Sequence, residues 1–415
     1  MTAGASLAPL RHAPFRWLAA GRTISMVGGA VAPIALAFAV LDLTGSVRDL
    51  GLVVGARSTA SVVFLLVGGV IADRFPRRLV MVAASTLAAL TQGLAAAAVV
   101  TGTATMPLLT ALALVNGTVA AFTFPASSAL LPQTVPPGIR QQANAINRLG
   151  ANGAMISGAA TGGVLVAVAG AGWGLAVDAG TFVVAAGCFA LVRVPDVRRP
   201  GAARRRVWSE LRDGWTEFTS RTWMWVVVVG FMVLNAAFAG AILVLGPAVA
   251  HDTIGRPAWG LVLAAQTAGA VVGAVVAMRL RVRRLLLVGV AAVATELLLV
   301  LGLALAPRVA VLMGAALLAG VGIEVFSIAW ETTVQEHVPA DKLARVYSYD
   351  ALGSLLAVRV GQVAAGPAAL ALGTEAALLA AVGVMGLAVV GMLASGDVRR
   401  LEHRVSPAAV PNADV

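Results

Sequence analysis

The sequence predicts an all-α membrane protein with twelve transmembrane helices, and three observations carry that prediction. Hydrophobic residues make up 59% of the 415 positions and charged residues only 12%, with a mean hydropathy of +0.91. A soluble protein carries about a quarter charged residues. Runs of about 20 apolar residues, long enough to span a bilayer as helices, recur along the chain. The alternating pattern of a membrane barrel is absent, so helices are the only backbone solution.

Each apolar run is one expected span. In chain order the spans cover residues 17–41, 50–72, 79–101, 107–131, 144–169, 173–193, 223–249, 258–278, 285–306, 309–332, 346–371 and 375–395. We read the first run as a retained helix because no small-residue cleavage site follows it. The single Cys188 lies in an apolar run, which excludes disulfides and cysteine-based metal sites.

Positive charge predicts the orientation of these spans. The loops on the side of the N-terminus contain Arg11, Arg16, Arg74, Arg77, Arg78, Arg140, the arginines of 193–221 and of 279–284, Lys342, Arg345, Arg399, Arg400 and Arg404. The opposite loops contain only Arg48, Arg256 and Arg308. Because cytoplasmic loops are enriched in lysine and arginine, both termini are expected in the cytoplasm, on a multi-pass protein of the cell (inner or plasma) membrane.

The longest loop divides the chain into two halves. We expect an N-terminal six-helix half at 1–193, a cytoplasmic linker at 194–222, a C-terminal six-helix half at 223–395 and a cytoplasmic tail at 396–415. In the linker Trp208, Leu211, Trp215 and Phe218 recur at helical spacing, after an arginine cluster that includes Arg204. This predicts an amphipathic helix on the inner membrane surface. The alternative is a featureless solvated linker.

The two halves repeat each other. Arg57-Ser58 matches Gln266-Thr267, and Arg77-Arg78 matches Arg283-Arg284. Further matches are Val135-Pro136 with Val338-Pro339, Asn147 with Asp350, Gly150 with Gly353, and Gly158 with Gly361. The second copy has no counterpart of Asp73, the acid that precedes Arg77-Arg78 in the first copy. Chance similarity between alanine- and glycine-rich helices is the alternative, but polar and proline matches in register favour two parallel six-helix repeats.

One loop packs an acid and three arginines into six residues, in the run Gly68-Gly69-Val70-Ile71-Ala72-Asp73-Arg74-Phe75-Pro76-Arg77-Arg78-Leu79. Gly69 allows another helix backbone to approach closely. A carboxylate at Asp73 is favoured by a helix N-terminus or by arginine partners. A plain loop that only fixes orientation would need the arginines but neither the acid nor the glycine.

This run resembles the signature loop between helices 2 and 3 of the major facilitator superfamily, whose pattern is Gly-x-x-x-Asp-Arg-x-Gly-Arg-Arg. The matching residues are Gly69, Asp73, Arg74, Arg77 and Arg78, whereas Pro76 replaces the last glycine of the pattern. The resemblance implies the major facilitator fold, with a substrate cavity between the halves near the bilayer midplane, and a gating role for this loop.

A second motif, on the fifth span, is Gly158-Ala159-Ala160-Thr161-Gly162-Gly163. It resembles the Gly-Pro-x-x-Gly-Gly antiporter motif of exporters in the superfamily, with Ala159 in place of the proline. A generic packing face explains Gly158, Gly162 and Gly163 equally well. The whole chain is similar to the exporter branch that includes macrolide and enterobactin efflux proteins, on the stretches Leu43-Thr44-Gly45-Ser46, Asp73-Arg74-Phe75-Pro76-Arg77-Arg78, Gln142-Ala143-Asn144-Ala145-Ile146-Asn147 and Trp330-Glu331-Thr332-Thr333-Val334-Gln335.

Polar residues inside spans are candidates for coupling or substrate binding, because they are costly in a bilayer. In the family, spans 1, 4, 7 and 10 line the cavity. By that resemblance Glu324 is the best cavity carboxylate, with Arg57 and Arg359 as cations; a permanent pair between Glu324 and an arginine is the alternative. Asp178 and Glu296 lie on spans 6 and 9, which the family places outside the cavity, so they are expected to be peripheral and structurally paired. Glu331 and Asp350 are expected to pair with Arg345 or loop arginines. Asn116, Asn152, Asn235 and Gln266 either bridge helices or contact substrate.

These observations predict a proton-coupled exporter, an antiporter of small amphipathic compounds such as drugs or secondary metabolites, and hence a role in efflux and drug resistance. An importer with the same fold is the alternative within this class, and a polytopic membrane enzyme or receptor is the alternative outside it. No clustered catalytic acids or metal ligands support an enzyme, and no Walker loop supports direct use of ATP. The net charge of +11 is spread over helix ends, which argues against nucleic-acid binding. We expect a monomer in the lipid bilayer that binds a small molecule and protons and needs no cofactor.

Overall fold

The chain folds into long helices, as the computed structural model of residues 7–195 and 207–403 shows. The helices of the first part are α2 (Ala13–Thr44), α3 (Val47–Arg74), α4 (Arg77–Val100), α5 (Met106–Leu130), α6 (Arg140–Ala169) and α7 (Ala171–Ala190). Those of the second part are α8 (Val207–Thr219), α9 (Thr222–Ala239), α10 (Gly246–Asp252), α11 (Arg256–Arg279), α12 (Leu285–Val293), α13 (Glu296–Leu305), α14 (Val309–His337), α15 (Leu343–Leu372), α16 (Thr374–Ala394) and α17 (Gly396–Arg400). Short helical turns cover Ala8–Arg11, Leu131–Gln133 and Pro137–Ile139.

Among the described residues, twelve helical segments are long and apolar enough to cross a membrane, which confirms the predicted number of spans. Two spans are interrupted helices: α9 and α10 are joined by a π-helical stretch at Gly240–Leu245, and α12 and α13 are separated by a turn at Ala294 and Thr295. Several helices continue past their apolar runs. The tenth span ends at His337 rather than at residue 332, because polar residues such as Gln335 and Glu336 are buried there.

Packing divides the described residues into two compact units. Among them, the first unit contains residues 7–136, 146–195, 207–215 and 338–349, and the second contains 137–145, 216–337 and 350–403. Two helices therefore contribute to both units: the first turns of α6 pack in the second unit, and the first turns of α15 pack in the first.

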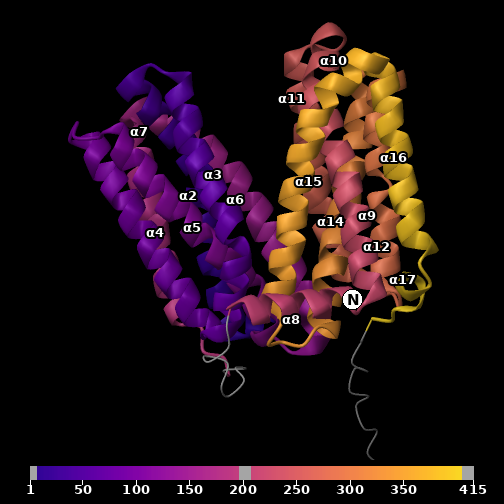
Figure 1. The fold of residues 1–415 in the computed structure, drawn as a ribbon, viewed down its shortest axis with the longest axis horizontal. Coiled ribbons are helices and arrows are strands. Elements are labelled where there is room, and N and C mark those ends of the chain that lie inside the picture. Colours follow the sequence, from indigo (N-terminus) through magenta and orange to yellow (C-terminus); the bar gives the residue numbers. More distant parts are fainter. Residues whose placement is uncertain (1–6, 196–206, 404–415) are drawn as a thin grey trace, which may run out of the picture. The chain divides into compact units, whose positions relative to one another are not determined.

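The first unit is a bundle in which α3 packs on α5, and α4 and α2 pack on α7 (Figure 1). Its described residues include two apolar clusters. One cluster lies towards the loop between α3 and α4, and we call it the loop-side cluster. It consists of Ala84, Ala88 and Val119 with Phe182 packed against them. The far-side cluster lies around Val53, Ala96, Ala113 and Leu175.

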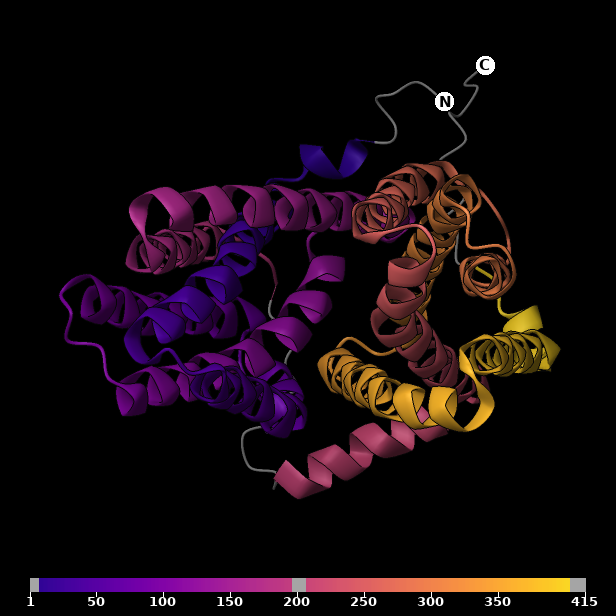
Figure 2. The ribbon, with the colours of Figure 1, turned by 90° about the horizontal axis from the view of Figure 1, so that it is seen from above.

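The second unit is a bundle in which α11 and α12 pack on α14, and α9 packs on α16 (Figure 2). Aromatic rings contribute to its interior: Phe231 of α9 stacks on Phe326 of α14, with ring centroids 4.7 Å apart. Trp223 lies edge-on to Trp330 at 5.8 Å.

The two units repeat the same close helix crossings. In the first unit Gly117 of α5 lies directly against the carbonyl of Arg57 on α3, with no room for a Cβ. In the second unit Gly320 of α14 lies in the same way against the carbonyl of Gln266 on α11. Arg57 and Gln266 are the residues matched by sequence, so the repeat is also present in the packing.

The predicted linker helix forms as α8. Phe218 is buried, and the exposed ring of Trp215 lies edge-on to Tyr349 with centroids 5.6 Å apart. Arg204 and the rest of 196–206 lie outside the described residues, as do the side chains of Trp208 and Leu211.

Candidate functional site: the Asp73 network

The loop after α3 turns without a glycine. Phe75 is extended, with φ −107° and ψ 156°, and Pro76 follows with φ −54° immediately before α4. Extended backbone is what a residue before proline prefers, and proline fits the start of a helix because its missing N–H has no partner there. The replacement of the pattern's glycine by Pro76 therefore leaves the acid and the arginines in place.

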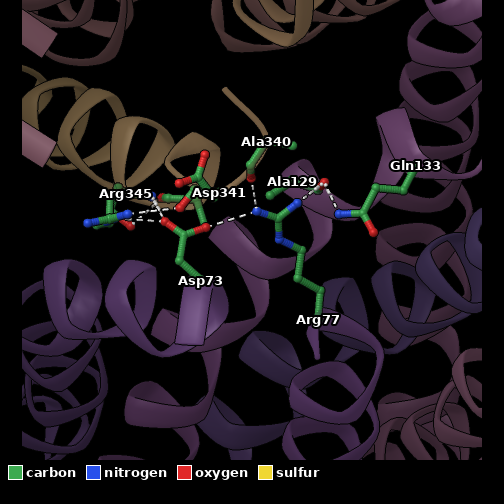
Figure 3. Close-up of polar contacts among 9 residues, drawn as sticks. Asp73, Arg77, Ala129, Gln133, Ala340, Asp341 and Arg345 are labelled. Atoms are coloured by element: carbon green, nitrogen blue, oxygen red, sulfur yellow. Dashed lines mark hydrogen bonds and ion pairs between the residues drawn. The ribbon is translucent and has the colours of Figure 1, made fainter. Parts of the chain in front are cut away.

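Asp73, in the last turn of α3, uses both carboxylate oxygens (Figure 3). Arg77 donates from Nη2 to Oδ1 at 2.9 Å, and Arg345 donates from Nε to Oδ2 at 2.9 Å. The backbone N–H of Arg345 also donates to Oδ2, at 3.4 Å. The Asp73 side chain is only 3% exposed. Charge-assisted bonds of this kind are about twice as strong as neutral ones, so Asp73 firmly joins α3, α4 and the start of α15.

Arg77 extends this network to two further backbone carbonyls. Its Nη1 donates to the carbonyl of Ala129 on α5 at 2.8 Å, and its Nη2 also donates to the carbonyl of Ala340 (Figure 3). Arg345 in turn donates from Nη2 to the carbonyl of Asp341 at 2.8 Å. A buried guanidinium is tolerated here because several acceptors surround it. We call Asp73, Arg77 and Arg345 the Asp73 network.

Gly69 lies one turn before Asp73 and faces the start of α15. A Cβ at this position would collide with the Ser348 hydroxyl and lie 3.0 Å from the Ala344 carbonyl. The glycine is thus needed for the close approach of the two helices. Arg78 makes a single long hydrogen bond, 3.5 Å from Nη1 to the carbonyl of Ala190, and Arg74 is partly buried at the end of α3.

A cavity of about 460 Å³ adjoins the network. Its lining includes Asp73, Arg77, Arg78, Gln133, Arg193 and Asp341. The cavity lies where α3, α5 and α7 end and α4 begins, so it belongs to the end of the first unit that carries the loop between α3 and α4.

The second unit has a corresponding network at the start of α6, built from amides. Asn144 donates from Nδ2 to the Thr332 hydroxyl and to Oε1 of Gln335, both at 3.0 Å. Gln335 donates back to Oδ1 of Asn144 at 3.1 Å. Gln141 bonds to the carbonyls of Ala277 and, at 2.8 Å, Leu280. We call Gln141, Asn144 and Gln335 the amide network.

Comparison with known proteins decides the family. The model described as Major Facilitator Superfamily matches residues 18–348. The chain belongs to the major facilitator superfamily. A search of curated proteins finds no match.

Solved structures of transporters share the fold. A bacterial homologue of the iron transporter ferroportin, crystallised in an outward-facing state, has a TM-score of 0.71 at 17% identity, over 92% of this chain and 98% of that one. The human organic anion transporter MFSD10 (TETRAN) has a TM-score of 0.69 at 15% identity, over 92% and 99%. A variant of the E. coli fucose:proton symporter FucP has a TM-score of 0.69 at 13% identity, over 91% and 97%. At such identities the likeness shows the fold alone.

The antiporter-like motif of this superfamily member lies where α6 crosses α2. Gly158 lies against the Val27 carbonyl, and a Cβ on Gly162 would lie 3.0 Å from the Cα of Val31. A Cβ on Gly163 would meet open space. Gly158 and Gly162 therefore have a packing role, whether or not they have another.

Within the first unit, the structure brings one of the predicted polar residues close to an acid that the sequence had assigned to the periphery. Arg57 on α3 acts electrostatically on Asp178 of α7, and Asn116 lies at the same level on α5. Asp178 accepts a hydrogen bond from Gln92, so the expected pairing of Asp178 is with an amide. Asn152, on α6, has a buried Nδ2 that lacks a partner in the described part of the chain.

Within the second unit, the predicted residues lie on several different helices. Glu324 is 2% exposed and its Cβ packs against Gly273 of α11. Arg359 is exposed and donates to Gln362, 3.3 Å away on the same helix. Asn235 on α9 and Gln266 on α11 are partly buried.

Two expectations for acids of the second unit were wrong. Asp350 accepts a hydrogen bond from the indole N–H of Trp330 at 2.9 Å, rather than from an arginine. Glu296, expected to be structurally paired, is 3% exposed and has no hydrogen bond or ion pair with the residues that the structure describes. It follows the turn that interrupts the ninth span, and an apolar sequence around it gave no sign of that turn.

Proposed function

We propose that the chain is a proton-coupled exporter of small amphipathic compounds such as drugs or secondary metabolites. The observation that carries the proposal is the Asp73 network, in which a buried carboxylate at the end of α3 holds Arg345, at the start of α15, at 2.9 Å. Alternating access requires the halves of such a transporter to rock about a central site. A bond of this kind stabilises one of the two conformations and must break in the other.

The cavity-lining helices expected from the family support a weakly charged substrate. The fourth span, α5, contains no charged residue. The resemblance of Gly158–Gly163 and of four further stretches to exporters supports the outward direction. Glu324 remains our candidate for the coupling acid, with Arg359 or the substrate as the cation that displaces its proton, and Asp350 is next in line.

The transporter acts, in this proposal, as a monomer in the cell membrane with both termini in the cytoplasm. The linker that includes α8 is on the same side, as its arginines favour. Labelling of single cysteines at positions 200–220 tests this orientation. Labelling from outside intact cells would overturn it.

A drug-susceptibility panel combined with vesicle transport tests the function. Cells that express the protein should tolerate higher concentrations of some amphipathic antibiotics or dyes than cells that express the Asp73→Asn variant. Inverted vesicles should accumulate the same compound when a proton gradient is applied, and a protonophore should abolish the accumulation. Uptake of the compound into intact cells would indicate an importer. Drug tolerance and vesicle accumulation that both persist without a proton gradient would contradict proton coupling.

Glu324→Gln sharpens the coupling assignment. A coupling acid, once neutralised, should leave substrate exchange largely intact but stop uphill accumulation, because no proton can be carried. A structural acid would instead leave a buried partner unpaired, at a cost of about 3–5 kcal/mol in stability. Exchange, gradient-driven accumulation and thermal stability are measured on the same preparation. Full gradient-driven accumulation by the glutamine variant would end the coupling role of Glu324.

A further inference from the structure

A layer of four polar side chains lies inside the first unit, between its two apolar clusters. We call it the polar layer, and its members are Arg57 on α3, Gln92 on α4, Asn116 on α5 and Asp178 on α7. One helical turn towards the loop side lie members of the loop-side cluster, Ala88, Val119 and Phe182. One turn the other way lie members of the far-side cluster, Val53, Ala96, Ala113 and Leu175. Residues three or four apart share a helix face, so each member of the layer points the way its apolar neighbours point.

Asp178 is the acid of the polar layer, and its hydrogen bonding is incomplete. It is 1% exposed. Its Oδ2 accepts a hydrogen bond from Nε2 of Gln92, whereas its buried Oδ1 has no partner among the residues described. An ionised carboxylate in an apolar interior normally takes several hydrogen bonds or an ion pair. One amide donor leaves most of its charge uncompensated.

The other members of the layer do not make up this deficit. Asn116 is 5% exposed, and its Nδ2 has no partner in the described chain. Arg57 acts on Asp178 through its charge, but no ion pair or hydrogen bond joins the two in the part of the chain that the structure covers. A donor and an acceptor are thus both left open in one buried layer.

The free oxygen of Asp178 faces α2 at a glycine. A Cβ on Gly28 would lie 2.5 Å from Oδ1, and it would also collide with the hydroxyl of Thr181. That hydroxyl donates to the backbone carbonyl of Asp178 at 2.7 Å, so it is not available to the carboxylate. A Cβ on the next residue, Gly29, would meet open space. At Gly28, α2 therefore presents its backbone, without a side chain, to the carboxyl group of Asp178.

The helices packed against α7 bring no second charge to Asp178. α2 offers Gly28 and α4 offers the neutral Gln92, so Arg57 of α3 is the one charged group that acts on it within the described residues. Burial favours the neutral acid, and a cation that approaches favours the carboxylate. Asp178 is thus placed to gain or lose a proton when Arg57 moves by a small distance.

We propose that Asp178 binds a proton within the polar layer, as a second proton site in addition to Glu324. The proton comes from water, adds to the carboxylate and leaves a neutral carboxylic acid hydrogen-bonded to Gln92. Movement of Arg57 towards the acid returns the proton. This inference rests on the proposed proton-coupled function.

Infrared difference spectroscopy of the purified transporter between acidic and alkaline buffer tests proton binding directly. A protonated buried carboxyl gives a C=O stretching band that an ionised carboxylate lacks. One component of this band should be missing in Asp178→Asn and should move in frequency in Gln92→Leu, which keeps the acid but removes its hydrogen bond. The matched control is Glu296→Gln, which removes a buried acid of the second unit and should leave that component in place. An unchanged band in both Asp178→Asn and Gln92→Leu would overturn the proposal.

Transport in proteoliposomes, with ethidium as the probe, separates this inference from the proposed function. If a proton gradient drives accumulation by the unmodified protein but not by Asp178→Asn, while ethidium exchange without a gradient persists, the proposal is supported. If both accumulate equally, Asp178 is not a proton site although the function holds. If neither responds to the gradient and the infrared component is absent, the proton-coupled function and the inference both fail. Should Asp178→Asn fail to fold, Gln92→Leu supplies the spectroscopic result.

Discussion

The Asp73 network and the amide network are two solutions to one structural problem. In each, the first turns of a helix pack in one unit, and the rest of that helix packs in the other. The helix is α15 at the Asp73 network and α6 at the amide network. Asp73 holds Arg77 and Arg345 by charged bonds of 2.9 Å. Asn144 and Gln335 hold each other by neutral bonds of 3.0 and 3.1 Å.

The difference between the networks concerns how each one can be broken. A charged bond contributes about 1.5–3 kcal/mol and a neutral one about 0.5–1.5 kcal/mol. The single carboxylate of Asp73 organises two arginines, so the loss of one group disrupts the whole network. The amide network distributes its bonds over reciprocal donors and acceptors, so it serves better as a fixed joint. We therefore expect transport to depend mainly on the Asp73 network, and stability to depend on both.

The largest effect is expected from Asp73→Asn. The amide can neither balance two guanidinium groups nor accept from both with a negative charge, so at least one charged bond is lost. A loss of about 1.5–3 kcal/mol shifts a balanced equilibrium between two conformations about tenfold or more. Transport into inverted vesicles should fall accordingly while the protein stays in the membrane. Asp252→Asn, which changes an exposed acid at the end of α10, is the matched control. Normal transport rates in Asp73→Asn would remove the gating role.

A smaller effect on transport is expected from Asn144→Leu in the amide network. The substitution removes two donated hydrogen bonds and one accepted bond and leaves the buried amide of Gln335 without its partner. An unsatisfied buried polar group costs about 1–3 kcal/mol, so the melting temperature should fall. Transport should fall less than in Asp73→Asn, because no charged bond changes. A variant that melts normally but does not transport would invert the comparison and assign the gating role to the amide network.

The sequence was informative where a pattern has one physical explanation. Twelve apolar runs of bilayer length left only helices, and the acid and arginines after Gly69 indicated a charged network at that loop. The sequence did not identify the partner across the chain: Arg345 lies 272 positions after Asp73, and it was considered only as a partner for other acids. Backbone acceptors such as the Ala129 carbonyl cannot be predicted from the pattern of side chains.

The polar layer was missed for a related reason. Asp178 was assigned to the periphery because its span lies outside the cavity in the family, but packing depth within one bundle is a different property from distance to the cavity. Arg57 and Asn116 were singled out as costly residues, yet single-residue arguments could not show that α3, α5 and α7 bring them to one level with Asp178. The unpaired state of Glu296 was equally invisible, since pairing depends on neighbours from other helices.

The smallest effect is expected from Pro76→Gly, which restores the family pattern at the turn before Arg77. Pro76 has φ −54°, a value that glycine adopts without strain, and the positive φ values of the described chain occur at other glycines. The folded geometry of the Asp73 network should therefore be unchanged. Glycine gives the unfolded chain more freedom than proline, which lowers stability by about 0.4–1 kcal/mol. Thermal melting should show a slight decrease, and vesicle transport should stay near that of the unmodified protein. If transport falls as far as in Asp73→Asn, the network depends on the stiffness of this turn, and the two networks differ in their loops as well as in their charges.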